Sequence, residues 1–318
     1  MPDRLGHPLE NPLFDQLTLI GVGLIGSSLA RVARRQNLAK TIVAIDSSEE
    51  ARKKITALQL ADRVTGDYAD GVKNADCIIL CVPVGACGSV MEKIAPSLKA
   101  GAILSDVGSV KGAIVSQIEP HLPKHVHFVP AHPVAGTEQS GPEAGFATLF
   151  NNRWCILTPP EGTDKDAVAK LRLFWEGAGS NVEEMSPSHH DLVLAITSHL
   201  PHLIAYNIVG TAADLEAVTE SEVIKFSAGG FRDFTRIAAS DPTMWRDVFL
   251  NNKDAVLEML GRFTEDLSAL QRAIRWGDGE MLFDHFTRTR AIRRSIIEIG
   301  QDSATPDFGR QTKDDPVQ

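Results

Sequence analysis

The sequence predicts an α/β protein with two domains, a doubly wound parallel sheet followed by an all-helical C-terminal domain. Apolar runs typical of buried parallel strands alternate with helical patterns as far as residue 186. A glycine-rich turn at 21–26 joins the first apolar run to the first helical pattern. Beyond Ser186 no further strand is expected, and amphipathic helical patterns continue to about Gly300.

Composition limits the classes of function. The 318 residues suffice for two domains, and 43% hydrophobic with 23% charged residues is typical of a globular protein. The net charge of −9 argues against a nucleic-acid partner, which needs a clustered basic surface. The first fifteen residues lack the features of a signal peptide, and the four cysteines lack metal-ligand spacing. We therefore expect a cytoplasmic protein with reduced thiols and no bound metal.

The domain boundaries follow from these patterns. Residues 1–15 form a lead-in, 16–186 the sheet domain, and 187–300 the helical domain. The polar tail 301–318 is expected to be disordered. The chain offers room neither for a fused second enzyme before residue 17 nor for a sensor domain in the tail, so we expect neither.

Each strand is expected where a short apolar run ends in a turn residue, and each helix where apolar residues recur with helical spacing. In the first domain the strands are expected at 17–20, 41–45, 77–82, 102–107, 126–130, 154–157 and 182–185. The helices between them are expected at 86–94, 111–119 and 164–178. In the second domain the clearest helices are 253–276 and 279–299.

The glycine turn has the spacing of a Rossmann dinucleotide site. Gly21 permits the tight turn, Gly23 lets the backbone approach a pyrophosphate, and Gly26 permits close packing of helix on strand. Asp46 ends the second expected strand, where its carboxylate can accept from the ribose 2′-OH of NAD and repel the 2′-phosphate of NADP. Ser47, Ser48 and Arg52 could instead favour a phosphate. The expected cofactor is NAD, bound by Gly21, Gly23, Leu24, Ile25, Gly26, Asp46, Val82 and Pro83.

The ligand of such a sheet lies outside the carboxyl ends of its strands. The dipeptides Val82-Pro83 and Gly108-Ser109 each follow an expected strand, and His132 lies in a bend just after another. We expect them to line one crevice with the glycine turn. His132 could accept a proton from a hydroxyl whose carbon loses a hydride, or it could be a loop histidine bonded to backbone.

Two further segments carry candidate chemistry. His199 and His202 could share one face of a helix, although two core histidines are the simpler interpretation, and Pro201 perturbs the helix. Arg232 or Arg236, among glycines and aromatics, could bind a carboxylate with a two-pronged guanidinium. The alternative for these arginines is a salt bridge to Asp233 or Asp247.

An uncharged stretch at 192–213 is long enough to cross a bilayer. It contains His199, Pro201, His202 and Asn207, and polar groups of this kind are costly in lipid. We therefore expect a helix buried in the protein or in a subunit interface, and no membrane partner.

The motifs GVGLIGSSLA, DVGSVK, HPVAGTEQSG, SHLPH and GGFRDFTRIAASDPTMWRD occur in this order. Together they make the chain, from about residue 17 to 299, resemble the prephenate/arogenate dehydrogenase family of tyrosine biosynthesis. The resemblance implies that His132 is the catalytic histidine, that Ser109 assists it, and that Arg236 binds a substrate carboxylate. It also implies a homodimer formed by the helical domain. Further substrate-site residues implied by position are His202, Ser198, Glu138 and Trp245.

The implied reaction is the NAD-dependent oxidative decarboxylation of prephenate to 4-hydroxyphenylpyruvate, with arogenate, converted to tyrosine, left open as a second substrate. A pocket with His202 beside Ser198 suits a keto acid, whereas the ammonium of arogenate needs an acid such as Glu138 or Asp191. Tyrosine, if it inhibits, is expected to compete in the active site. The alternatives are another two-domain NAD(P) enzyme, of β-hydroxyacid dehydrogenase or imine reductase type, and a non-catalytic NAD-sensing regulator.

Overall fold

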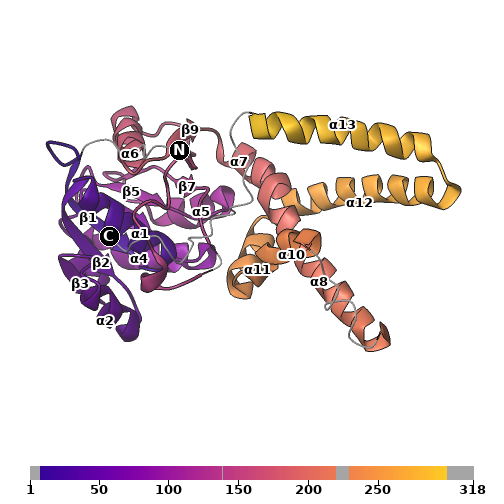
Figure 1. The fold of residues 1–318 in the computed structure, drawn as a ribbon. Coiled ribbons are helices and arrows are strands. Elements are labelled where there is room, and N and C mark those ends of the chain that lie inside the picture. The colour runs from indigo at the N-terminus through magenta and orange to yellow at the C-terminus, as the bar shows by residue number, and fades with distance from the viewer. Residues whose placement is uncertain (1–7, 138, 220–228, 299–318) are drawn as a thin grey trace. The chain divides into compact units, whose positions relative to one another are not determined.

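The computed structural model describes residues 8–137, 139–219 and 229–298 (Figure 1). The chain divides into two compact units, Met1–Met259 and Leu260–Gln318. The first contains both sheets and the helices that surround them. The expected disorder of 301–318 lies outside the described residues.

A six-stranded parallel sheet forms the centre of the first unit, in the order β3-β2-β1-β4-β5-β6. The order reverses between β1 and β4, and the carboxyl ends of the strands at such a reversal are where a sheet of this kind binds its ligand. The expected doubly wound topology is thus confirmed. The strands are β1 (Phe14–Ile20), β2 (Ala39–Ile45), β3 (Arg63–Thr65), β4 (Cys77–Leu80), β5 (Ile103–Asp106) and β6 (His127–Phe128).

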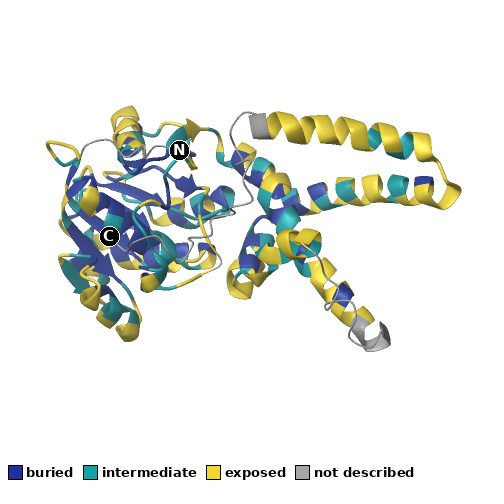
Figure 2. Ribbon diagram, in the orientation of Figure 1, coloured by how far each residue is buried: buried dark blue, intermediate teal, exposed yellow. Residues whose placement is uncertain are grey.

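Helices cover both faces of this sheet, because side chains along each strand point alternately to the two faces. In β1, Leu17 and Leu19 belong to one buried cluster with Trp175, while Ile20 belongs to the other with Met91. Figure 2 shows the strands as the most continuously buried part of the unit. The helices are α1 (Leu24–Arg35), α2 (Glu49–Ala57), α3 (Tyr68–Val72), α4 (Cys87–Ile94), α5 (Lys111–Ile118) and α6 (Lys165–Gly177).

A second sheet of three strands, β7 (Ala131–Pro133), β8 (Trp154–Leu157) and β9 (Asn181–Glu184), places His132 inside a strand. The sequence placed this histidine in a bend, so that expectation is wrong in detail. The cause is Pro130, which has no N–H with which to extend the first sheet. The Pro130 carbonyl instead accepts from the Thr158 amide at 2.9 Å, and β7 pairs antiparallel with β8.

The helical part of the first unit begins with α7 (Pro187–Leu194), a π-helical turn (Ala195–His199) and α8 (Leu200–Thr219). Pro201 has no N–H to donate to the carbonyl of residue 197, which favours the irregular turn just before it. Shorter helices follow, and the chain then enters α12. The shorter elements are α10 (Gly229–Thr235), the 3₁₀ turn η6 (Arg236–Ala239) and α11 (Pro242–Asn251), and the long helix is α12 (Lys253–Trp276).

The segment Pro187–Leu215 is long and apolar enough to cross a membrane, and only 28% of its most apolar window is buried within one chain. Its exposed apolar side chains include Ile196, Ile208 and Leu215. It also holds the buried polar residues His190 and His199. This composition fits a surface covered by protein better than one covered by lipid.

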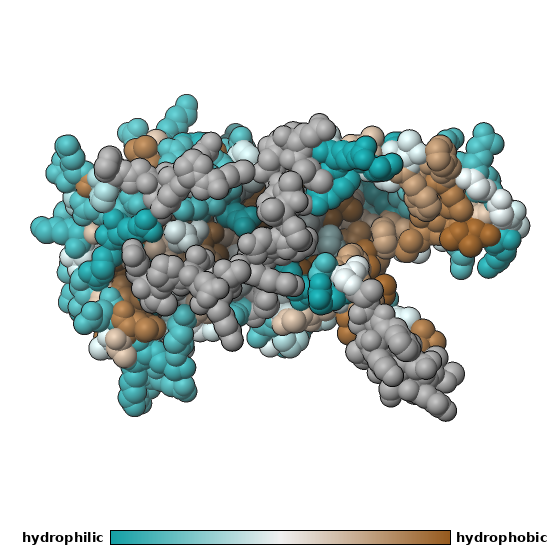
Figure 3. Space-filling view, in the orientation of Figure 1, coloured by the Kyte–Doolittle hydropathy of each residue, from teal (hydrophilic) through white to brown (hydrophobic). Residues whose placement is uncertain are grey.

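The second unit contains the rest of α12 and the helix α13 (Gly279–Glu298), which runs antiparallel to α12 in Figure 1; the sequence predicts both helices. Hydrophobic side chains gather over these helices in Figure 3. Among the described residues of the second unit the most exposed apolar side chains are Ile274, Trp276, Phe283 and Phe286, each at least 55% accessible. A single chain therefore leaves a large apolar surface uncovered.

Candidate active site

The glycine turn has the shape that a dinucleotide requires. Gly21 has φ +84°, and a Cβ built on Gly26 would lie 2.4 Å from the Gly21 carbonyl oxygen. A Cβ on Gly23 would have no neighbour within 4 Å, and no side chain caps α1 at this residue. The first amides of α1, including those of Leu24 and Ile25, are therefore open to a pyrophosphate. These residues fit NAD.

Asp46 lies at the end of β2, directly beside the turn. Its Oδ2 accepts from the Val22 amide at 3.2 Å and its Oδ1 from the Ser48 amide at 2.9 Å. The Arg52 guanidinium donates to the backbone oxygens of Asp46 and Ser47 at 2.8 and 3.0 Å. Arg52 is thus bonded to the backbone of the loop that follows β2, and it makes these contacts with carbonyl oxygens and not with the Asp46 carboxylate.

Val82 and Pro83 follow β4 on the other side of the turn. A Cβ on Gly21 would lie 2.8 Å from Val82 Cγ1, so this dipeptide lies beside the glycine turn as the sequence predicts. Ser109 lies in the loop between β5 and α5 and is half-buried. The Gly108 amide in this loop donates to Asp106 Oδ2 at 2.7 Å.

A buried ion pair connects that loop to the strand of His132. The Lys111 ammonium contacts Asp106 Oδ2, and neither side chain has any exposed surface. Lys111 Nζ also donates to the carbonyl of Ala131 at 2.7 Å. Sequence reasoning assigned no role to either residue. The available signal was a lysine and an aspartate inside the DVGSVK motif, because lysine is rarely buried unless it is paired.

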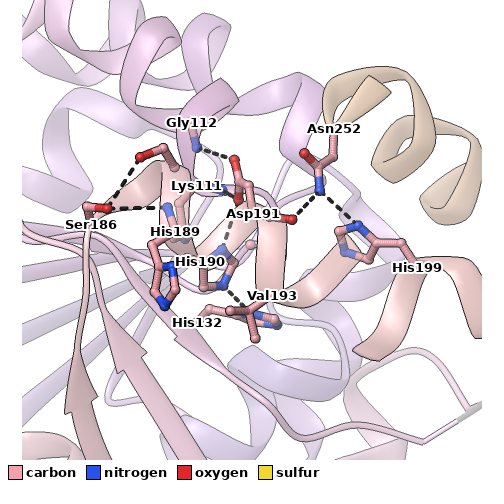
Figure 4. A network of polar contacts seen from close by, with 12 residues as sticks. Lys111, Gly112, His132, Ser186, His189, His190, Asp191, Val193, His199 and Asn252 are labelled. Atoms are coloured by element: carbon pink, nitrogen blue, oxygen red, sulfur yellow. Dashed lines mark hydrogen bonds and ion pairs between the residues drawn. The ribbon is translucent and has the colours of Figure 1, made fainter. Parts of the chain in front are cut away.

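His132 is the first member of a buried chain of polar side chains (Figure 4). His132 Nδ1 lies 2.8 Å from His190 Nε2, and His190 Nδ1 lies 2.8 Å from Asp191 Oδ1. His132 is 8% exposed and His190 is fully buried. Burial lowers the pKa of His132 well below the ordinary value and also lowers that of His190, so both imidazoles are neutral near pH 7.

Asp191 connects these hydrogen-bonded side chains to the start of α5. Its Oδ1 accepts from the Lys111 amide and its Oδ2 from the Gly112 amide, both at 2.8 Å. A Cβ on Gly112 would lie 3.0 Å from Oδ2, so glycine permits this approach. Both carboxylate oxygens are therefore engaged within the protein, and Asp191 is unsuited to pairing a substrate ammonium.

His202 and Trp245 meet in a second group of side chains. Their rings stack with centroids 3.6 Å apart and planes inclined by 23°. His202 Nδ1 donates to the Ser198 carbonyl at 2.8 Å, so the contact with Ser198 is through its backbone. Burial lowers the pKa of His202, and the nearby charge of Arg236 lowers it further. The structure thus brings together four of the expected substrate-site residues.

His199 lies behind this group, fully buried, in the π-helical turn. Its Nδ1 lies 3.1 Å from the side-chain nitrogen of Asn252, Nδ2. The same nitrogen donates to the backbone carbonyl of Asp191 at 2.9 Å. Within the described residues its Nε2 has no hydrogen-bond partner. Burial lowers the pKa of His199 to about 4. The sequence could not reveal that Asn252 joins His199 to α7.

Arg232 forms a salt bridge with Asp233 at 3.2 Å, which is the alternative expected for that arginine. Asp247 forms a salt bridge with Arg246 at 2.7 Å. Glu138 lies outside the described residues. Over the described ranges no three histidine, cysteine, aspartate or glutamate side chains are grouped as a metal site, and the cysteines are free thiols.

Comparison with known proteins supplies the family. Residues 29–184 match the family model described as prephenate dehydrogenase, nucleotide-binding domain. Residues 186–288 match the model described as prephenate dehydrogenase, dimerization domain. Together the two matches cover both parts of the chain.

Individual relatives agree. A cyclohexadienyl dehydrogenase of Zymomonas mobilis is 44% identical over 89% of this chain and 97% of its own length. A prephenate dehydrogenase of Bacillus subtilis is 36% identical over 94% of this chain and 80% of its own. The structure of Aquifex aeolicus prephenate dehydrogenase with hydroxyphenyl propionate and NAD+ superposes with a TM-score of 0.83 at 36% identity, covering 89% and 98% of the two chains. The chain therefore belongs to the prephenate/arogenate dehydrogenase family.

Proposed function

We propose that His132 is the proton acceptor in the oxidation of prephenate by this chain, an NAD-dependent prephenate/cyclohexadienyl dehydrogenase. The observation that carries the proposal is the place of His132. It is a buried, neutral imidazole on β7, tied through Lys111 to the end of β5, on the sheet edge that also holds the glycine turn. A neutral imidazole held at the cofactor's edge of the sheet can take a hydroxyl proton.

The main task of the protein in this reaction is to align the substrate with the hydride acceptor and the proton acceptor. Prephenate is a cyclohexadiene with a hydroxyl on one ring carbon and a carboxylate across the ring. Bound NAD supplies the acceptor for the hydride of the hydroxyl-bearing carbon. His132 takes the hydroxyl proton as the carbonyl forms, and loss of carbon dioxide then makes the ring aromatic. Positioning of this kind lowers a barrier without covalent catalysis.

The other residues have binding roles in this proposal. Ser109 assists His132 beside the nicotinamide, and Arg236 binds a substrate carboxylate. His202, Ser198 and Trp245 line the substrate pocket, a placing supported by the stacking of His202 on Trp245 and the charge of Arg236 nearby. Glu138 governs access. The NAD residues are Gly21, Gly23, Leu24, Ile25, Gly26, Asp46, Val82 and Pro83.

Prephenate is the proposed substrate, and arogenate is tested beside it. Asp191, one of two acids that could have paired the ammonium of arogenate, is engaged by α5 and His190. The deciding measurement is kcat/KM for both substrates at one pH with saturating NAD. A ratio favouring arogenate by more than about tenfold, equivalent to about 1.4 kcal/mol, would show that the pocket recognises the ammonium.

The oligomeric state, the cellular location and the mode of inhibition are part of the same proposal. The helical domain, from residue 187 onward, forms a homodimer that covers the apolar faces of α8, α12 and α13, and the protein works in the cytoplasm without a nucleic-acid or membrane partner. Tyrosine, if it inhibits, competes with prephenate. Sedimentation of the purified protein at micromolar concentration tests the dimer, and a monomer there would contradict it.

The activity has a direct test. Purified protein is mixed with NAD and prephenate, and NADH is followed by absorbance. Turnover with prephenate supports the proposal. Turnover of β-hydroxyacids with NAD, or of imines with NAD(P)H, but not of prephenate would favour another two-domain dehydrogenase, and NAD binding without turnover would favour a regulator.

A further inference from the structure

The hydrogen bonds that join His132, His190 and Asp191 determine which ring nitrogen of each histidine carries the proton. At one end, Asp191 accepts two backbone N–H groups of the first turn of α5. The positive end of that helix favours a negative charge at this point. A carboxylate can only accept hydrogen bonds, so His190 Nδ1 must carry the proton that bridges to Asp191 Oδ1.

The position of the proton on His190 then determines the position of the proton on His132. His190 is neutral because burial lowers its pKa, so its second nitrogen, Nε2, has a lone pair and accepts. His132 Nδ1 lies 2.8 Å from His190 Nε2 and must then be the donor. His132, also neutral, is left with its lone pair on Nε2. Of its two ring nitrogens, only Nε2 can then receive a proton.

We infer that His190 and Asp191 form a positioning pair that fixes His132 in the Nδ1–H tautomer and thereby presents Nε2 to the substrate hydroxyl. The inference rests on the proposed role of His132. In the step itself the substrate O–H bond breaks and an N–H bond forms at His132 Nε2. His132 becomes an imidazolium, while His190 and Asp191 neither gain nor lose a proton.

The surrounding charges make this support necessary. Burial and the charge of Lys111 both oppose a positive charge on His132, whereas His190 and His199 are neutral near pH 7. The charge of Lys111 is balanced by Asp106 in their buried pair. Asp191 is then the carboxylate connected to His132 by hydrogen bonds, and it orients the imidazolium through His190, as carboxylates orient catalytic histidines elsewhere.

The first test observes the tautomer without any turnover. The full-length protein is labelled with [15N]histidine, and the ring nitrogens of His132 are assigned by their loss in the His132→Asn variant. We expect a single neutral tautomer with the proton on Nδ1. A proton on Nε2 in the unmodified protein would overturn the inference. Because no substrate is present, this result stands even if prephenate proves not to be oxidised.

The second test uses a matched pair of substitutions. His190→Gln keeps an acceptor for His132 Nδ1–H, whereas His190→Leu has similar bulk and no acceptor. We expect kcat to fall by about 10² or more in the leucine variant, in the range for loss of a general base, with KM changed less than about threefold. The glutamine variant should recover most of kcat.

The control is His189→Leu, at the exposed neighbour of His190 on the same helix, which should leave kcat and KM unchanged. Equal losses of kcat in the glutamine and leucine variants at position 190 would mean that His190 only packs, and would overturn the inference. If the leucine variant does not fold, the tautomer measurement on the unmodified protein still decides.

Discussion

Lys111 and Asp106 form an ion pair in which neither side chain is exposed to solvent, directly between the end of β5 and the strand that carries His132. Lys111 also donates to the carbonyl of Ala131, the residue before His132. Its own backbone amide is capped by Asp191. One lysine therefore holds the loop of Ser109, the strand of His132 and the start of α5 in a fixed relation.

Breaking this pair should destabilise the protein strongly. Lys111→Met leaves the Asp106 carboxylate buried without its partner, which typically costs about 3–5 kcal/mol. Urea unfolding measures the change. The control is Lys53→Met, which removes an exposed pair with Glu49 and should leave the midpoint unchanged. A Lys111→Met protein as stable as the control would show that Asp106 finds another partner.

Asp46 should set the preference for NAD. Its carboxylate would repel a 2′-phosphate, and Arg52 is engaged by backbone carbonyls beneath it. Asp46→Ala should therefore reduce the NAD over NADP ratio of kcat/KM by about tenfold or more, equivalent to about 1.4 kcal/mol. Glu49→Ala, at an exposed acid on α2, is the control. An unchanged ratio in Asp46→Ala would assign the preference to other residues.

Arg236 and Arg232 should differ sharply when substituted. Arg236 lies close enough to His202 for its charge to lower the pKa of that histidine, whereas Arg232 pairs with Asp233 on the surface. Hydrogen bonds to charged groups contribute about 1.5–3 kcal/mol, so Arg236→Gln should raise KM for prephenate by roughly 10- to 100-fold. Arg232→Gln should leave KM nearly unchanged. The reverse result would move the carboxylate contact to Arg232.

His199 should make the protein sensitive to acid. Its pKa is about 4 when folded, against an ordinary value near 6.5 when unfolded. Between these values the unfolded chain binds the extra proton, so stability is complete above about pH 6.5 and falls towards pH 4, by about 1.4 kcal/mol per pH unit for this group. Unfolding free energies of the unmodified protein and His199→Gln, measured from pH 7.5 to 5, should show a shallower fall in the variant. Parallel curves would remove His199 from the explanation.

The sequence predicted the elements whose signals are local. The apolar runs of β1, β2 and β4 and the glycine turn at 21–26 are each contiguous, and the structure places them where expected. The strand of His132 was missed because it depends on pairing with β8, beside which the Pro130 carbonyl accepts from the Thr158 amide. His190, the hydrogen-bond partner of His132, lies 58 positions away from it in the sequence. Asp191 accepts from the Lys111 amide, 80 positions away. Contacts at such separations leave no pattern in a single sequence, so the candidate base could be predicted and its supports could not.

The role of His132 as proton acceptor is decided by the steady-state kinetics of His132→Asn with NAD and prephenate. Asparagine keeps a hydrogen-bonding side chain but cannot accept the hydroxyl proton. We predict a fall in kcat of about 10² to 10⁴, typical for loss of a general base, with only a modest change in KM. Turnover close to that of the unmodified protein would remove His132 from the mechanism.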